Sequence, residues 1–551
     1  MKKLNVALIA LNSKYIHSSL GVWYVLAGLK EYGSGHNACV LEGTINQDKL
    51  KVIDAIVSKN PDVVGFSCYI WNITRIKEIA KAVKATLPHC VIIFGGPEVS
   101  FNAAEVLEQN EFVDYVISGE GEYPFAALCD AIASGGSTDI DGVCTRADIK
   151  PPYISNAQPP SPYSSEYFNA LGGRIVYFEA SRGCPFNCAF CLSSRCTGVV
   201  NIDLERVERE LLALANSGAK TIKFVDRTFN AHKVRAKSII RFICSNYGKK
   251  IPSGVCFHFE IAADILDSEL IELLTSAPIG AIQLEIGMQS FNEKTLEYIN
   301  RKTNTAVLID NINKLVAARN MHIHVDLIAG LPYEDVASFK DSFNKAYYLG
   351  SDMLQLGFLK LLYGAPMRED SQKFPCEYSA EPPYEVISTP WLTSDDIKRL
   401  KAIEDAVDRA YNSGRFKDTI AYAVGCGHTP FDVFLHISQR IKCSEGVSLQ
   451  SYTEQLYSAL LTLDGVDGEN LRDNMVCDLF ATTKGAKLPK LLQRADARLK
   501  KAHALVPNIK DTMYAVAILY SKNKIVYANY TTPDPITKRY RLGFLPLETE
   551  E

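Results

Sequence analysis

The first 140 residues alternate between short apolar runs and amphipathic segments, and this alternation restricts the fold more than any other feature of the sequence. Apolar runs separated by helix-like segments are typical of a doubly wound parallel sheet, whose ligands bind beyond the carboxyl ends of the strands. We therefore predict an α/β domain over residues 1–140. The expected strands are residues 5–11, 38–41, 63–67, 91–96 and 115–119, and the expected helices are residues 20–31, 49–59, 74–87 and 103–108.

The loops at these predicted strand ends contain small residues. Ser67 ends the third strand, Gly95 and Gly96 end the fourth, and Gly119-Glu120-Gly121 ends the fifth. Glycine lets the backbone approach a bulky ligand closely, but it also permits a tight turn without any ligand. Both explanations stay open for each turn taken singly.

A segment rich in proline and serine, residues 150–165, marks the end of this domain. Six further strand–helix units follow it. A span of roughly 200 residues is too short for a full eightfold barrel of about 250 residues, so we expect a partial (β/α)6 barrel. Its expected strands lie near residues 174–180, 221–225, 255–262, 281–287, 322–329 and 353–359.

The remaining chain is mostly helical by periodicity from residue 394 to about residue 499, and an apparent hairpin of residues 513–520 and 524–530 follows. The fold class is therefore α/β with a mainly helical C-terminal domain. The predicted boundaries are residues 1–140 for the α/β domain, 141–173 for a linker, 174–372 for the barrel, 373–390 for a second linker and 391–551 for the C-terminal domain.

Composition indicates the compartment and the kinds of partner that the protein has, but not its chemistry. A net charge of −4 indicates neither a polyanionic partner nor a membrane surface, and no apolar stretch approaches the ~20 residues of a membrane span. The apolar run after Met1-Lys2-Lys3 is short and lacks a small-residue cleavage site, so we interpret it as a strand rather than a signal peptide. Fifteen cysteines without regular spacing indicate a reducing compartment, and we expect a cytoplasmic protein.

Three cysteines, Cys184, Cys188 and Cys191, follow the first predicted barrel strand with the spacing C-x3-C-x2-C. Three thiolates leave one coordination position open, whereas a structural zinc site has four closed ligands. Cys196 could supply a fourth ligand, so a closed structural site is the alternative. A metal loop at the carboxyl end of the first strand of a βα array lies where such folds place their active sites.

Residues 181–191 resemble the signature of the radical S-adenosylmethionine (SAM) superfamily, Cys-x3-Cys-x-aromatic-Cys, with Phe190 as the aromatic residue. The resemblance implies a 4Fe-4S cluster on Cys184, Cys188 and Cys191 whose unique iron binds the amino and carboxylate groups of SAM. One electron then cleaves SAM to methionine and a 5′-deoxyadenosyl radical, which abstracts a hydrogen atom from the substrate. A reductant such as flavodoxin or ferredoxin would be a partner.

The preceding α/β domain resembles the Rossmann-like cobalamin-binding domain found before the barrel in one radical SAM class, which includes class B methyltransferases. The Asp-x-His-x-x-Gly motif that supplies a cobalt ligand in other cobalamin proteins is absent, and the radical SAM class commonly lacks it too. We interpret His17 and His36 as ordinary surface or loop residues.

The cobalamin resemblance also implies roles for individual residues. Ser67 would hydrogen-bond the nucleotide tail, and Tyr69 and Trp71 would cover the lower face of cobalt, with simple packing of the two aromatic rings as the alternative. The residues expected to line the slot of the tail are Gly95, Gly96, Gly119, Glu120 and Gly121.

Three residues of the barrel are expected at SAM. Asp226 follows the second strand, where the family binds the SAM ammonium group, although a salt-bridged loop carboxylate is the alternative. Glu285 and Gln289 lie on the fourth strand in a segment similar to the Glu-x-Gly-x-Gln-Ser pattern of this class, and they would bind the ribose hydroxyls and methionyl group. His258 and Glu260 share one face of the third strand, and the pattern does not decide between the barrel interior and the helix layer.

The C-terminal region weakly resembles a domain of unassigned function found on some cobalamin-type radical SAM proteins. A basic stretch from Lys484 to Lys501, expected on helix, would contact RNA phosphates or form a solvated helix face, and we favour the solvated face.

The favoured function is methylation of an unactivated carbon by an enzyme that uses a 4Fe-4S cluster, SAM and cobalamin. The substrate is unknown, with a small molecule preferred over RNA or a peptide, and no catalytic residue is assigned. Two alternatives stay open. The first is radical rearrangement, cyclisation or ring contraction without methyl transfer, and the second is a non-catalytic corrinoid or cluster carrier.

Overall fold

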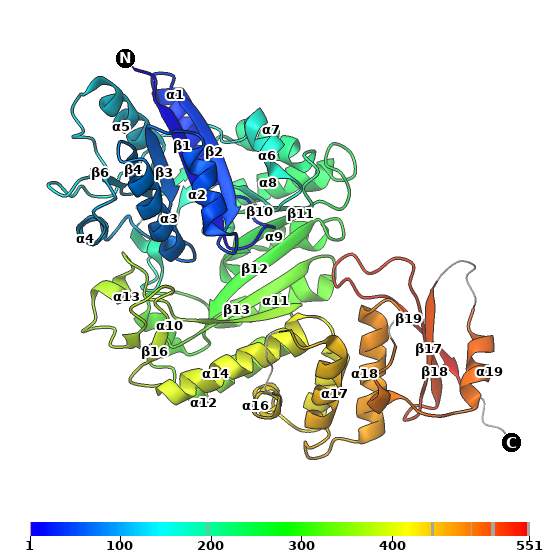
Figure 1. Cartoon of the computed structure of the whole chain (residues 1–551). Coiled ribbons are helices and arrows are strands. Elements are labelled where there is room, and N and C mark those ends of the chain that lie inside the picture. The colour runs from blue at the N-terminus through cyan, green and yellow to red at the C-terminus, as the bar shows by residue number, and fades with distance from the viewer. Residues whose placement is uncertain (1, 196–197, 442–445, 486, 508–512, 548–551) are drawn as a thin grey trace. The chain divides into compact units, whose positions relative to one another are not determined.

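The computed structural model describes residues 2–195, 198–441, 446–485, 487–507 and 513–547 (Figure 1). The chain forms two units, each discontinuous in sequence. The first consists of Met1–Leu266, Tyr298–Lys302 and Leu359–Ile387, and the second of Asp267–Glu297, Thr303–Phe358 and Ser388–Glu551. None of the described helices is both long enough and apolar enough to cross a membrane.

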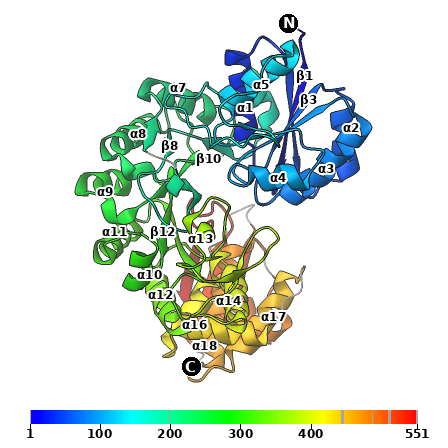
Figure 2. The ribbon, with the colours of Figure 1, turned by 90° about the vertical axis from the view of Figure 1, so that its left-hand side faces the viewer.

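The first unit begins with the predicted doubly wound sheet, whose strand order is β2-β1-β3-β4-β5-β6. Helices α1 and α5 cover one face and α2 and α3 the other (Figure 2). The short antiparallel β6 is an addition that the sequence did not predict. The strands are β1 (Asn5–Asn12), β2 (Asn37–Thr44), β3 (Val63–Ser67), β4 (Val91–Gly95), β5 (Tyr115–Ile117) and β6 (Val143–Cys144), and the helices are α1 (Gly21–Tyr32), α2 (Lys49–Val57), α3 (Ile73–Thr86), α4 (Ala103–Gln109) and α5 (Glu122–Ser134).

Burial explains why these segments form these elements. Strand β1 is buried from its second residue to its last, as expected for a parallel strand covered on both faces. Helix α3 buries Ile76, Ile79 and Val83 on one stripe against the sheet. Helices α1 and α5 cross closely at Gly28, because a Cβ atom there would lie 2.4 Å from the carbonyl oxygen of Glu122.

The first unit also contains the first three barrel strands. Strands β7, β10 and β11 are parallel neighbours, in the order predicted. A short antiparallel pair, β8 and β9, flanks the cysteine loop and was not predicted. The elements of this part are α6 (Ser165–Leu171), β7 (Val176–Phe178), β8 (Ser181–Gly183), β9 (Val199–Asn201), α7 (Leu204–Ala215), β10 (Thr221–Phe224), α8 (Lys233–Asn246), β11 (Cys256–Ile261), α13 (Pro366–Glu369), β15 (Glu377–Tyr378) and β16 (Val386–Ser388).

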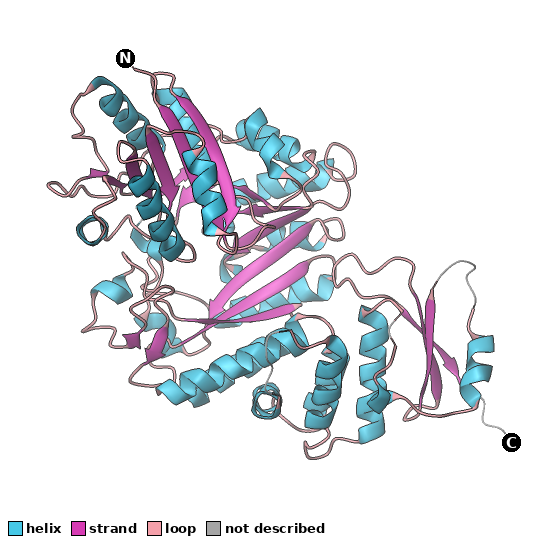
Figure 3. Ribbon diagram, in the orientation of Figure 1, coloured by secondary structure: helices cyan, strands magenta, loops and turns pink. Residues whose placement is uncertain are grey.

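The second unit contains the other three barrel strands, β12, β13 and β14, again parallel and adjacent. All six predicted barrel strands are therefore present, and Figure 3 shows strands and helices alternating along the barrel region. The elements are α9 (Ser268–Thr275), β12 (Ile282–Gln289), α10 (Glu293–Tyr298), α11 (Thr305–Ala318), β13 (His322–Ala329), α12 (Val336–Tyr348) and β14 (Met353–Phe358).

The C-terminal region is helical and ends in a small antiparallel sheet of order β17-β18-β19. The predicted hairpin is confirmed, and β19 adds a third strand. The prediction of a basic helix is wrong for most of the described residues from Lys484 to Lys501, which form one short 3-10 helix at Lys490–Leu492 and α-helix only from Arg498. The elements are α14 (Ser394–Val407), α15 (Lys417–Gly425), α16 (Pro430–Arg440), α17 (Leu449–Leu460), α18 (Gly468–Thr482), α19 (Arg498–Leu505), β17 (Tyr514–Leu519), β18 (Lys524–Asn529) and β19 (Leu542–Pro546).

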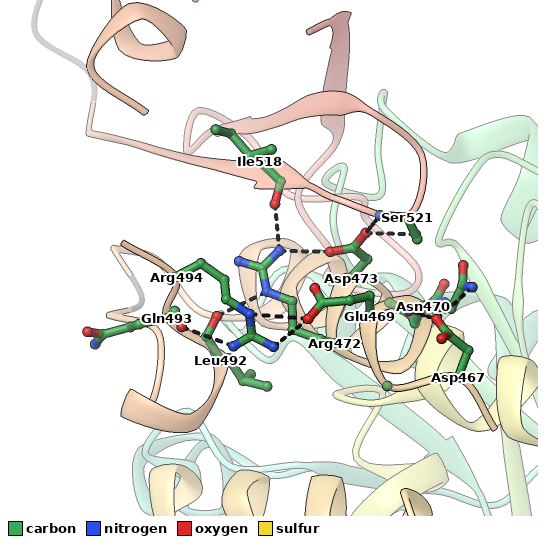
Figure 4. A network of polar contacts seen from close by, with 12 residues as sticks. Asp467, Glu469, Asn470, Arg472, Asp473, Leu492, Gln493, Arg494, Ile518 and Ser521 are labelled. Carbon is green, nitrogen blue, oxygen red and sulfur yellow. Dashed lines mark hydrogen bonds and ion pairs between the residues drawn. The ribbon is translucent and has the colours of Figure 1, made fainter. Parts of the chain in front are cut away.

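A buried ion pair attaches this sheet to α18 (Figure 4). Arg472 and Asp473, 2% and 1% exposed, are 2.7 Å apart. Arg472 also donates to the carbonyl oxygen of Ile518 at 2.5 Å, while Asp473 accepts from the backbone N–H of Ser521 at 2.8 Å. Two charged side chains of one helix thus hold the end of β17 and the turn that follows it.

Candidate functional site

The cysteine loop follows β8 and is held by backbone contacts on both sides. The N–H of Ala189 donates to the carbonyl oxygen of Ile299 at 2.9 Å. The carbonyl oxygen of Ala189 accepts from the N–H of Met367 at 3.0 Å. Inside the loop, the N–H of Cys191 donates to the carbonyl oxygen of Cys188 at 3.0 Å, which closes a turn between two of the predicted ligands.

The donor set of the loop fits an iron–sulfur cluster. Cys184, Cys188 and Cys191 are free thiols, and the first two are buried, so a bound cluster would be shielded from water. Burial raises the pKa of the Cys188 thiol, and the guanidinium of Arg301, 3.9 Å from its sulfur, acts in the opposite direction. Cys196, the alternative fourth ligand, lies outside the described residues.

Within the described ranges, no three His, Cys, Asp or Glu side chains lie close enough together to hold one metal ion. A four-iron cluster separates its thiolates by several bonds. The case for such a cluster in this chain therefore rests on the donor type and on the loop, and the assignment of the three cysteines stays a prediction.

Asp226 follows β10, is 2% exposed, and contacts the chain that leads into the cysteine loop. Its carboxylate accepts hydrogen bonds from the N–H of Ala180 at 2.9 Å and from the hydroxyl of Ser181 at 2.5 Å. Burial raises its pKa to about 7, and these two hydrogen bonds act in the opposite direction. Asp226 thus fixes the chain between β7 and β8, and its predicted contact with the SAM ammonium group is not tested by this geometry.

The structure decides the face of β11 that the sequence left open. Phe257 and Phe259 are fully buried, and the ring of Phe259 lies 4.2 Å from that of Phe229, which borders helix α8 in a small cavity that Arg235 and Ile239 also line. His258 and Glu260 therefore point to the opposite face of the strand. In a barrel sheet, the face away from the helices is the interior.

Polar side chains occupy this interior face across three neighbouring strands. Tyr177 on β7, Lys223 on β10 and His258 on β11 are in register, and the Lys223 ammonium lies 3.3 Å from the Glu260 carboxylate. His17, which the sequence analysis treated as an ordinary loop residue, reaches the Tyr177 hydroxyl through Nδ1 at 2.7 Å. Only the fold reveals this contact, because 160 positions separate the two residues.

Glu285 and Gln289 lie on one face of β12, where half-buried polar positions alternate with buried apolar ones. A register shift between Gly287 and Gln289 ends the regular pairing with β13, and Gln289 adopts a left-handed backbone with φ of 71°. Such an irregularity reorients a side chain at a strand end. The predicted SAM contacts of both residues stay predictions.

Glu334, which the sequence analysis did not identify, lies next to the end of β12. Its carboxylate accepts hydrogen bonds from the hydroxyls of Ser290 at 2.5 Å and Ser342 at 3.0 Å, and the residue is 0% exposed. Burial raises its pKa to about 7, with the two serine hydrogen bonds acting in the opposite direction. No local sequence pattern marks this residue, since one partner lies 44 positions before it and the other lies eight positions after it.

The glycines at the edge of the N-terminal sheet differ in whether a larger residue could replace them. Gly96 and Gly119 have positive φ, and a Cβ atom on either would lie within 2.5 Å of a backbone oxygen, so packing alone requires glycine at both. A Cβ atom on Gly95 would meet only Ile117, at an ordinary distance of 3.8 Å, and one on Gly121 would lie 3.3 Å from Val25. Among these four, Gly95 shows the least structural need for glycine, and its place in a ligand slot stays a prediction.

Ser67, the last residue of β3, lies close to Tyr69 and Trp71, which follow the strand. The rings of Tyr69 and Trp71 stack with centroids 4.3 Å apart and planes 11° apart. The Trp71 indole N–H donates to the carbonyl oxygen of Leu11 at 3.1 Å, although the side chain as a whole is exposed. Burial raises the pKa of Tyr69, and a hydrogen bond with Ser67 acts in the opposite direction.

Arg182, which the sequence analysis also did not single out, connects the N-terminal sheet edge to the cysteine loop. Its guanidinium contacts the carboxylates of Glu120, Glu122 and Glu179 at 2.8, 2.6 and 2.9 Å. Burial opposes the charge of Arg182, and Glu122 and Glu179 more than offset that effect, so its pKa is raised. Burial also raises the pKa of Glu120, against the effect of Arg182.

Family models match three consecutive parts of the chain. The B12 binding domain matches residues 6–129, the Radical SAM superfamily matches residues 178–346, and a protein family of unknown function, DUF4080, matches residues 372–526. These matches define the class as radical SAM proteins. The chain is a radical SAM superfamily protein with an N-terminal cobalamin-binding domain and a C-terminal domain of unknown function.

Curated relatives share moderate identity with the chain. The cobalamin-dependent radical SAM methyltransferase TokK of Streptomyces tokunonensis is 28% identical over 355 residues, which cover 58% of this chain and 49% of TokK. The hopanoid C-3 methylase of Methylococcus capsulatus is 26% identical over 328 residues, or 56% of this chain and 59% of that enzyme. The chain thus spans about half the length of the curated relatives it matches.

Solved structures share the fold. The cobalamin-dependent radical SAM enzyme OxsB, with aqua-cobalamin and SAM bound, matches 93% of this chain and 82% of its own at a TM-score of 0.62 and 15% identity. The methyltransferase TsrM of Kitasatospora setae, with cobalamin and a 4Fe-4S cluster bound, matches over 67% of this chain and 75% of the TsrM chain. The TM-score is 0.57 and the identity is 17%. At such identities the likeness establishes the fold alone.

Proposed function

We propose that this protein is a cobalamin-dependent radical SAM methyltransferase that methylates an unactivated carbon of a small molecule. The observation that carries the proposal is the direct contact, within the first unit, between the cysteine loop and the edge of the cobalamin-binding domain through Arg182. Relatives described as methyltransferases support the reaction type, and the tryptophan bound to TsrM supports a small-molecule substrate.

Each cofactor is assigned to residues of this chain. Cys184, Cys188 and Cys191 would hold the 4Fe-4S cluster, and Asp226, Glu285 and Gln289 would bind SAM. When bound, the cluster and SAM supply abstraction of a hydrogen atom, and cobalamin supplies the methyl group.

The cobalamin-binding domain would hold its cofactor mainly by shape. Gly95, at the end of β4, has only ordinary contacts around the place of a Cβ atom, and Ser67 would offer a hydroxyl to the nucleotide tail. The stacked rings of Tyr69 and Trp71 form a flat apolar surface that would exclude water from the lower face of cobalt. The remaining slot residues are Gly96, Gly119, Glu120 and Gly121.

The test is anaerobic reconstitution with iron, sulfide, cobalamin, SAM and a reductant, with deproteinised cell extract as the source of substrate. Mass spectrometry then quantifies the products of SAM. Methyl transfer predicts S-adenosylhomocysteine and 5′-deoxyadenosine in equal amounts that depend on the extract. Formation of 5′-deoxyadenosine alone would exclude methylation in favour of another radical reaction, and absence of cleavage would indicate a carrier.

Two cysteine variants control this test. Cys188→Ala should abolish both the cluster absorbance and the cleavage of SAM, while Cys244→Ala, a half-buried cysteine on α8 outside the loop, should retain both. Retained cleavage in Cys188→Ala would mean that the cluster is bound elsewhere.

A further inference from the structure

We propose that Arg182 is a positioning residue that couples occupancy of the cobalamin site to occupancy of the cluster site. This inference rests on the proposed function, because it concerns the two cofactors assigned there. It adds that the two sites do not load independently, and that one guanidinium transmits the effect.

Each nitrogen of the Arg182 guanidinium has its own carboxylate partner. Nη1 lies 2.8 Å from Glu120, Nη2 lies 2.6 Å from Glu122 and Nε lies 2.9 Å from Glu179. The ring of Tyr24 lies 4.8 Å from the guanidinium carbon. Only the planar fork of arginine can meet three carboxylates in this way, since a lysine ammonium is a single point of charge.

The three carboxylates belong to parts of the chain with different roles. Glu120 lies in the turn after β5 that is expected to line the cobalamin slot, and Glu122 begins α5 of the same domain. Glu179 follows the first barrel strand, β7. Arg182 itself lies on β8, two positions before the predicted cluster ligand Cys184.

The charge balance makes this contact hard to break. Three carboxylates face one cation, and the four side chains are between 10% and 23% exposed. If Arg182 moved away, three poorly solvated carboxylates would lose their counter-charge, which is costly for buried groups. A displacement of β8 is therefore passed to the Glu120 turn, and a displacement of that turn is passed to β8.

A bound cluster would hold Cys184 and with it β8, which lies directly before Cys184 in the chain. A bound cobalamin would hold the Glu120 turn. By thermodynamic reciprocity, a cluster that changes the affinity for cobalamin implies that cobalamin changes the affinity for the cluster by the same factor. Linked sites typically show factors of about 5 to 150.

The experiment measures the affinity of the full-length protein for hydroxocobalamin by anaerobic absorbance titration, with and without the reconstituted cluster. In the wild type we expect the two dissociation constants to differ by at least about 5-fold. Arg182→Lys keeps the charge but loses the fork. In this variant we expect the ratio of the two dissociation constants, without and with the cluster, to be close to 1, with normal iron content. The electron paramagnetic resonance signal of the reduced cluster should change on adding cobalamin in the wild type, and not in the variant.

Arg174→Lys is the matched control. Arg174 pairs with Glu42 at 2.8 Å and also joins β7 to the cobalamin-binding domain, but it contacts neither the Glu120 turn nor β8. We expect this control to keep the wild-type ratio. Glu120→Gln removes one contact and keeps the side-chain shape, so it should bring the ratio of the two dissociation constants closer to 1. It is the replacement test if Arg182→Lys does not fold.

The possible failures are distinguishable. A wild-type protein that binds no cobalamin or assembles no cluster would overturn the proposed function, and this inference with it. A wild type that binds both cofactors with a ratio near 1 would overturn the coupling alone. So would an unchanged ratio in Arg182→Lys, or an equal loss in Arg174→Lys.

Discussion

The hydroxyl of Tyr384 donates a hydrogen bond to the carboxylate of Glu98, a residue 286 positions earlier in the chain. Glu98 follows Gly95 and Gly96 at the end of β4, and Tyr384 belongs to Leu359–Ile387, here called the closing segment. Both side chains are buried, and the guanidinium of Arg368 lies 4.6 Å from the Tyr384 ring. The cobalamin-binding domain is thus covered by chain that follows all six barrel strands.

Tyr384→Phe should destabilise the first unit by about 1–3 kcal/mol, because it leaves the buried Glu98 carboxylate without its hydroxyl donor. Chemical denaturation followed by tryptophan fluorescence measures the effect. Tyr363→Phe is the matched control, since Tyr363 lies in the same segment and donates to Glu105 at 3.1 Å in an exposed position. Equal effects of the two changes would contradict this role for the Glu98 contact.

Trp71→Ala should weaken cobalamin binding by about 2- to 10-fold, the range expected for loss of one aromatic contact. Because Trp71 is 46% exposed, its removal should leave the unfolding transition nearly unchanged. Absorbance titration with hydroxocobalamin measures the affinity. Tyr32→Ala removes a similarly exposed ring from α1 of the same domain and should bind cobalamin normally. Normal binding by Trp71→Ala would remove the ring from the cobalamin site.

Glu334→Gln should reduce the pH dependence of stability. Because burial raises the pKa of Glu334 from 4.5 to about 7, the folded state keeps a proton that the unfolded state releases. The stabilising effect of that proton is complete below pH 4.5 and is lost as the pH rises towards 7. Glutamine is neutral throughout and still offers polar atoms to Ser290 and Ser342.

Thermal unfolding at pH 5 and pH 8 compares the two proteins. The decrease in melting temperature between these values should be smaller in Glu334→Gln than in the wild type, by an amount equivalent to at most about 3 kcal/mol. Glu272→Gln, at an exposed position on α9, should behave like the wild type. A parallel pH profile for Glu334→Gln would show that Glu334 ionises normally in the fold.

Asp473→Ala should destabilise the C-terminal sheet by about 3–5 kcal/mol, because it leaves the Arg472 charge buried without its partner. Amide hydrogen exchange in β17 and β18 would report the loss locally. Arg494→Gln breaks the more exposed pair with Glu469 in the same region (Figure 4) and should cost less than about 1 kcal/mol. Slow exchange retained in Asp473→Ala would mean that apolar packing alone holds the sheet.

The parallel strands were predictable because they are buried on both faces and therefore form continuous apolar runs. The bounds expected for residues 63–67 and 322–329 agree with β3 and β13. Short polar strands give no such signal, and β8 consists only of Ser181, Arg182 and Gly183. It exists through its pairing with β9, a long-range effect that no local pattern encodes.

The candidate site likewise contains some residues that local sequence patterns identify and others that only the fold brings together. Motifs identified the cysteines and the strand-end residues by their type and spacing, whereas the partners of Arg182 and Glu334 depend on tertiary contacts. The basic segment failed as a helix prediction for a related reason, since Arg494 pairs with Glu469 at 2.7 Å and Arg498 with Asp496 at 2.8 Å. Arg494 lies in chain without regular structure and the second pair lies at the start of α19, and helix periodicity describes neither contact.

The closing segment also has a consequence for the order in which the protein is made. Translation releases the cobalamin-binding domain first, but Tyr384 leaves the ribosome only after all of the barrel strands. Until then Glu98 lacks its hydroxyl donor, so the nascent domain cannot reach its final packing while the rest is being synthesised. A gene fragment that stops at Leu266 would encode every strand of that domain and still yield it in this unfinished condition.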